Sequence, residues 1–195
     1  MVQVRRGFKT WCENTARSYR IELGQPPDSP LDPRKLAEKL GIKVIVVADI
    51  DGLEEAHKVR LTNGESQAWS AATLRDGNRS LIIVNEGQTA ARQNNSICHE
   101  IGHIALGHKA PKMIMLEGGY MMMADYDPVM EEEATIFAGA VLAPREALLS
   151  LISKGMNNYE IASHFGISTH LVEMRKNITG IGFQLARRQR GTWVP

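Results

Sequence analysis

The chain has 195 residues, 43% of them hydrophobic and 23% charged, and a net charge of +1 at pH 7. This length and composition fit one globular domain with a buried core, so we exclude a disordered or fibrous chain. The near-neutral charge does not favour nucleic acid or a membrane surface as the main partner, and two cysteines exclude a disulfide framework.

The first fifty residues predict two helices and a strand. Aromatic and apolar residues recur at helical spacing over residues 7–23, which predicts the first helix. Asp32 followed by Pro33 is typical of a helix start, and Gly41 of a helix end, so a short helix is predicted between them. The β-branched residues of 42–47 predict a strand.

The next segments predict the rest of a small sheet and a long helix. Residues 67–74 and 80–85 read as strands on either side of Asp76-Gly77, a hairpin signal. Together with 42–47 they predict a mainly antiparallel sheet of about three strands. A helix is then predicted from about Thr89 to Leu106, ended by Gly107.

The remaining segments predict one irregular stretch and then helices. Residues 109–126 are expected to be irregular or weakly helical. The methionine-rich part, 113–123, is interpreted either as an adaptable lid beside a cleft or as a core or dimer contact. Further helices are predicted in three places, at 127–142, at 145–153 and as a pair around 166–168.

The last pair of helices resembles a helix-turn-helix. The basic residues nearby are Arg175, Lys176, Arg187, Arg188 and Arg190. A DNA reader usually has a denser basic surface, so helix packing or substrate docking is favoured over DNA contact. We expect a core over residues 1–144 and a helical segment over 145–195 packed on it.

The sequence HEIGH at 99–103 has the His-Glu-x-x-His spacing of a metal site. His99 and His103 are four residues apart, so on a helix they project from one face and can share one cation. Glu100 lies beside that face, where a carboxylate can take a proton from a metal-activated water. The alternative is a surface helix that happens to carry histidines.

A third ligand is expected from the helix that begins at Asp127-Pro128. On a helical wheel Glu131 shares a narrow face with Ala134 and Ala138, which allows close approach of a neighbouring helix. We therefore predict Glu131 as the third ligand, with Glu133 as the alternative. Zn²⁺ is the expected ion, and Mn²⁺ or Fe²⁺ would also accept mixed nitrogen and oxygen donors.

Other side chains receive lesser roles. His108 would point away from His99 on an ideal helix, so we expect a role at the helix end rather than as a ligand. Cys98 is expected to be a small buried residue. Tyr120 and Tyr126 are both candidates for stabilising an oxyanion, and the sequence does not choose between them.

Two segments resemble the ImmA/IrrE family of metallo-endopeptidases: HEIGHIALGH at 99–108 and EEEATIFAGAVLAP at 131–144. Weaker similarity extends to residues 29–45 and 161–177. The resemblance implies an α+β fold with a zincin-like core, the ligands His99, His103 and Glu131, and Glu100 as catalytic base. Thr135 stands where the family often has asparagine.

The resemblance also implies a substrate. Members of this family typically cleave a helix-turn-helix repressor and so relieve repression in mobile-element or stress regulons. The favoured hypothesis is therefore a zinc-dependent endopeptidase that acts on such a repressor. The alternative is a non-catalytic metal module that binds a repressor or DNA through its last helices. No signal peptide or membrane-spanning run is apparent, so we expect a cytoplasmic protein with no membrane partner.

Overall fold

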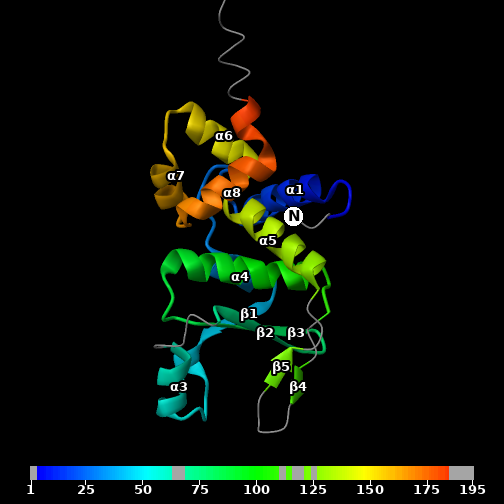
Figure 1. The fold of residues 1–195 in the computed structure, drawn as a ribbon, viewed down its shortest axis with the longest axis vertical. Coiled ribbons are helices and arrows are strands. Elements are labelled where there is room, and N and C mark those ends of the chain that lie inside the picture. Colours follow the sequence, from blue (N-terminus) through cyan, green and yellow to red (C-terminus); the bar gives the residue numbers. More distant parts are fainter. Residues whose placement is uncertain (1–3, 63–68, 110–112, 116–120, 124–126, 185–195) are drawn as a thin grey trace, which may run out of the picture.

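The computed structural model describes residues 4–62, 69–109, 113–115, 121–123 and 127–184 (Figure 1). The helices are α1 (Phe8–Glu22), α2 (Pro33–Lys39), α3 (Glu55–Thr62), α4 (Ala90–Ala105), α5 (Pro128–Leu142), α6 (Arg145–Ser153), α7 (Asn158–Phe165) and α8 (Thr169–Thr179). The strands are β1 (Ile42–Val46), β2 (Ala71–Asp76), β3 (Arg79–Val84), β4 (Met113–Met115) and β5 (Met121–Met123). The fold is thus α+β, as predicted, and it is mainly helical.

The main sheet has three strands in the order β1-β3-β2. The predicted hairpin is present, because β2 and β3 pair antiparallel around Gly77, which has a φ of 56°. However, β1 pairs parallel with β3, so the sheet is mixed and not mainly antiparallel as predicted. The long connection between β1 and β3, which includes α3, gives the chain room for the crossover that parallel pairing requires.

Helix starts agree closely with those predicted from the sequence, whereas three elements, α3, β4 and β5, were not predicted. The Asp32 side chain accepts from the amide of Arg34, and Asp127 caps α5 in the same way, each followed by proline at the first helical position. Helix α3 was missed because it buries no residue and so has no apolar period to detect. The pairing of β4 with β5 corrects the expectation that 109–126 would be irregular or weakly helical.

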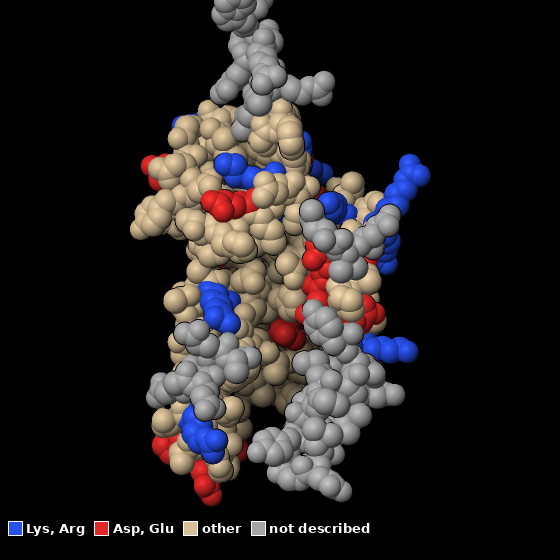
Figure 2. Space-filling view, in the orientation of Figure 1, with Lys and Arg blue, Asp and Glu red and all other residues tan. Residues whose placement is uncertain are grey.

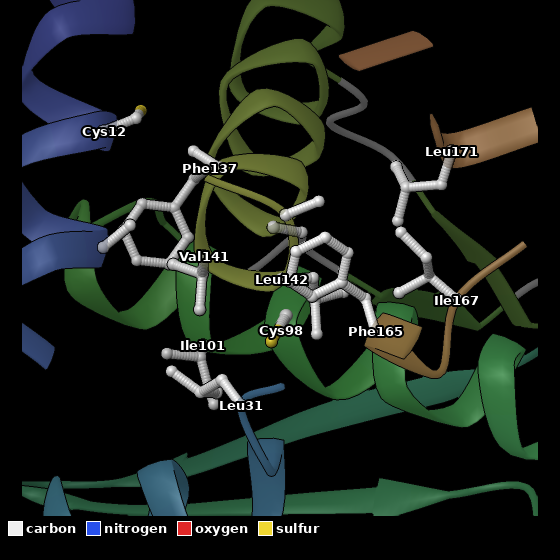
Figure 3. Close-up of a cluster of buried hydrophobic side chains, with 14 of the residues drawn as sticks. Cys12, Leu31, Cys98, Ile101, Phe137, Val141, Leu142, Phe165, Ile167 and Leu171 are labelled. Carbon is white, nitrogen blue, oxygen red and sulfur yellow. The ribbon is translucent and has the colours of Figure 1, made fainter. Parts of the chain in front are cut away.

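Helix α4 lies between the sheet on one side and helices α1 and α5 on the other (Figure 1). Its residues Ile97, Cys98 and Ile101 are fully buried. Figure 3 shows Cys98 and Ile101 facing the same apolar cluster as Phe137 and Val141 of α5. Burying this face fixes the rotation of α4 about its axis, and therefore the direction of the histidines on its remaining surface.

Helix α5 is apolar because it lies in the core. Ala134 and every residue from Ile136 to Leu142 are buried. No single helix in the described part of the chain is both long and apolar enough to cross a membrane. Helices α5 and α6 taken together are long and apolar enough, but the chain bends by 49° between them.

The contact between α4 and α5 depends on Gly102. A Cβ placed there would lie 3.0 Å from Cδ1 of Phe137 and 3.3 Å from Cα of Ala134. The second neighbour is backbone, which cannot turn aside as a side chain can. The missing side chain at Gly102 therefore sets how closely α5 approaches the histidine-bearing helix.

We expect Gly102→Ala to lower the free energy of unfolding by about 1 kcal/mol. Overpacking typically costs about 1–3 kcal/mol, while the helix propensity of alanine returns up to about 1 kcal/mol. Urea denaturation at constant pH measures the difference. Gly182→Ala is the matched control, because a Cβ there meets no atom within 4 Å. Equal stability of the two variants would contradict the close-approach interpretation.

The helices α6 and α8 are joined to α1 through one carboxylate. The Arg175 side chain, 1% exposed, donates to Glu13 and, through Nε, to the carbonyl of Ala143 at 2.9 Å. The other oxygen of Glu13 accepts from the amide of Arg145 at 2.9 Å. Arg175 is therefore buried and bonded within the protein, although in the sequence it is one of the basic residues near the last pair of helices.

Candidate metal centre

Two helices place three metal-binding groups together. Helix α4 provides His99 and His103, and the first turns of α5 provide Glu131. The two Nε2 atoms lie 3.0 Å apart, and they lie 3.2 and 3.4 Å from the two oxygens of Glu131. Donors held 2.0–2.1 Å from one tetrahedral ion are separated by about 3.3–3.4 Å, so these three groups fit a shared cation.

The protonation states at this cluster suit a cation. Burial, together with the neighbouring His99, lowers the pKa of His103 to about 4, so its ring is neutral at pH 7 and keeps a lone pair for a metal. The hydrogen bond from His99 lowers the pKa of Glu131, which keeps that carboxylate ionised. The cluster thus offers a neutral imidazole at His103 and a negative oxygen at Glu131.

The two carboxylates that the sequence left as alternatives are separated by the fold. Glu131 faces the paired imidazoles, whereas Oε2 of Glu133 lies 3.2 Å from Nε2 of His108. Glu133 is also the more enclosed of the two, with 12% of its side chain exposed against 39% for Glu131. Figure 2 shows acidic side chains gathered where α5 begins, beside the end of α4.

The position of His108 differs from the ideal-helix extrapolation. Helix α4 ends at Ala105, and Gly107 has a φ of 66°, so the chain reverses and the His108 ring turns back toward the helix. Its Nδ1 lies 3.0 Å from Nδ1 of His103. Gly107 is identifiable in the sequence as the helix end. Because a glycine in the left-handed conformation reverses the chain there, Gly107 is the residue from which the contact between His108 and His103 could have been predicted.

Glu100 is held by the neighbouring sheet. The hydroxyl of Thr73, on β2, donates a hydrogen bond to Oε2 of Glu100. No hydrogen bond to Oε1 comes from another residue in the described ranges. One oxygen is thus held by Thr73, while the second stays available to a water or a substrate. Sequence reasoning missed Thr73, because nothing in a single strand indicates which helix residue will lie opposite.

Other predicted residues have clear positions or lie outside the described ranges. Cys98 is fully buried, as expected, and burial raises the pKa of its thiol. Tyr120 and Tyr126 lie outside the described residues, so the question of the oxyanion group stays open. Strands β4 and β5 cover part of the methionine-rich stretch, and its two interpretations remain predictions. The amine of Lys176 donates to Asn158 at 3.0 Å.

Comparison with known proteins agrees with the geometry. The family model of the IrrE N-terminal-like domain, an M78 peptidase family, matches residues 37–177, a range that includes α4 and α5. No curated protein sequence matches the chain. The fold is similar to that of a transcriptional regulator from Mycobacterium tuberculosis, with a TM-score of 0.53 and 13% identity. The match covers 87% of this chain and 46% of the regulator, so the chain spans less than half of that protein.

Proposed function

The chain belongs to the IrrE N-terminal-like family of M78 peptidases, and we propose that it is a metal-dependent endopeptidase. The observation that carries the proposal is the cluster of His99, His103 and Glu131, with donor separations of 3.0–3.4 Å, directly beside Glu100. Three protein ligands leave a fourth position for water, as in catalytic zinc sites. Zinc is the proposed ion, and manganese or iron fits the same donors.

The residues of this chain divide the reaction between them. A zinc ion held by His99, His103 and Glu131 would polarise the scissile carbonyl and lower the pKa of water. Glu100 takes one proton from the attacking water, whose oxygen joins the carbonyl carbon. Glu100 then passes that proton to the amide nitrogen as the carbon–nitrogen bond breaks, which releases a carboxylate and an amine. Thr73 holds Glu100 so that the same oxygen can serve in both steps.

The free edge of the sheet offers a place for the substrate backbone. Within the described chain β2 pairs only with β3, so the outer edge of β2 has backbone groups available for an added strand. Thr73 comes from this same strand, which brings a peptide added there close to Glu100. Strand addition would fix the register of the scissile bond relative to that carboxylate.

The proposed substrate is a helix-turn-helix repressor in the cytoplasm. This part of the proposal rests on the resemblance of 99–108 and 131–144 to metallo-endopeptidases that cleave such repressors. The two cysteines, both buried and unpaired, are compatible with a reducing compartment.

Incubation with the helix-turn-helix protein encoded next to this chain tests the function. We expect shorter fragments to form in the presence of zinc and not to form when a chelator is present from the start. Electrophoresis and mass spectrometry detect the fragments. A stable complex with an intact partner would instead support the non-catalytic alternative. The buried position of Arg175 does not favour DNA binding by α8.

Thr73→Val is expected to lower the rate of cleavage about 10- to 100-fold and leave zinc affinity unchanged. Valine keeps the shape of threonine but cannot donate to Glu100, and a hydrogen bond to a charged group contributes about 1.5–3 kcal/mol. Single-turnover cleavage and a zinc titration measure the two effects. Thr73→Ser, which keeps the hydroxyl, is the control. If valine and serine behave alike, Thr73 does not position the base.

A further inference from the structure

We propose that His108 and Glu133 are positioning residues that hold His103 in the one tautomer able to bind the metal. This inference rests on the metal centre proposed above. The three side chains form a chain of contacts, His103 to His108 and His108 to Glu133, which we term the relay. The Nδ1 atoms of His103 and His108 lie 3.0 Å apart, and Nε2 of His108 lies 3.2 Å from Oε2 of Glu133.

The chemistry of imidazole fixes the direction of every proton in the relay. If Nε2 of His103 binds a cation, its proton must be on Nδ1, and Nδ1 then donates to Nδ1 of His108. His108 accepts there, so its own proton lies on Nε2, from which it donates to Oε2 of Glu133. The relay ends on a carboxylate, which needs no proton of its own. All three members are therefore satisfied in a single arrangement.

Backbone contacts fix the relay in place. The amide of His108 donates to the carbonyl of His103 at 3.0 Å, and the guanidinium of Arg75 on β2 donates to the carbonyl of His108 at 2.8 Å. His108 is only 6% exposed and the Glu133 side chain 12%. A hydrogen bond in such a setting is shielded from water, which makes it stronger and its loss more costly.

Support of this kind is given to one imidazole and not the other. Among the residues that the structure describes, none makes a hydrogen bond to Nδ1 of His99, while Nδ1 of His103 meets His108. A ligating histidine whose second nitrogen donates to a fixed acceptor binds more tightly, because the ring is already oriented and is more basic. The relay therefore makes His103 the anchored ligand of the pair.

Titration with Zn²⁺ alone, in competition with a chromophoric chelator, tests the relay without any substrate. We expect His108→Ala and Glu133→Ala each to raise the Kd for zinc roughly 10- to 100-fold, and Glu133→Gln to give a smaller increase, because its amide oxygen still accepts. The double variant should be little worse than either single variant, because both act through the same ring. Glu132→Gln is the matched control, since the side chain of Glu132, on the same helix, makes no hydrogen bond or ion pair with another described residue.

A spectroscopic signature separates positioning from general structural damage. In zinc-loaded protein labelled with ¹⁵N-histidine, the Nδ1 proton of His103 should give a resonance protected from exchange. This protected resonance should be absent from the spectrum of His108→Ala and present in that of Glu132→Gln. Wild-type zinc affinity in both His108→Ala and Glu133→Ala would overturn the relay alone. Failure of the wild-type chain to bind zinc would overturn the proposed function together with it.

Discussion

Glu100→Gln is expected to bind zinc as tightly as the wild type and to cleave about 10²- to 10⁴-fold more slowly. The amide has the shape of the carboxylate and can still accept from Thr73, so the local structure is preserved. It cannot take a proton from water, however, and the proton has no other acceptor in the proposed mechanism. Cleavage is measured under single-turnover conditions, and metal content by elemental analysis of the same samples.

The control for this variant is Glu38→Gln, which removes one exposed carboxylate from α2 and should change neither property. Two outcomes would contradict the assignment. Cleavage at the wild-type rate would show that Glu100 is not the base. Loss of zinc together with activity would show that Glu100 contributes to holding the metal.

Glu131→Ala is expected to raise the Kd for zinc by more than the roughly 10- to 100-fold that is typical when a residue hydrogen-bonded to a metal ligand is removed. Without this carboxylate only His99 and His103 remain, and two imidazoles do not complete the three-ligand set of a catalytic zinc site. The thermal stabilisation that added zinc gives to the wild type should disappear at the same time, because that stabilisation depends on the ratio of free metal to Kd. Chelator competition and thermal unfolding with and without zinc provide the two measurements.

Comparison with Glu133→Ala and Glu132→Ala distinguishes the three adjacent carboxylates. The expected order of zinc loss is Glu131 first, then Glu133 acting through His108, with Glu132 unaffected. If Glu133→Ala lost the greater affinity, Glu133 would be the third ligand, and the two carboxylates would be arranged differently once the metal is bound.

Much of this arrangement is readable from the sequence because it is local. The start of α5 follows from Asp127-Pro128, and the common face of His99 and His103 follows from their spacing on a helix. The narrow face of small residues around Ala134 indicated that another helix would pack closely, and Gly102 of α4 lies there.

The parts that were missed depend on contacts between distant segments. Thr73 meets Glu100 across 27 residues of chain, and the parallel pairing of β1 depends on the route of a connection. His108 was misplaced for a different reason: an ideal helix was extended beyond Gly107, where the left-handed backbone ends it. In each case the contact depends on the three-dimensional path of the chain, which the spacing of residues in the sequence does not predict.

The bridge from Glu13 to Arg175 limits how far this protein can be trimmed. A chain ending at Leu142 would deprive Glu13 of both the guanidinium of Arg175 and the amide of Arg145. It would also bare the side of α5 at Gly139, where the Arg175 stem and the tip of Met174 come within 2.8 and 3.0 Å of the point that a Cβ would occupy. We therefore expect the smallest stable part of this chain to extend through α8. A transfer of α4 and α5 into another protein would have to include the α8 residues that pack against α5.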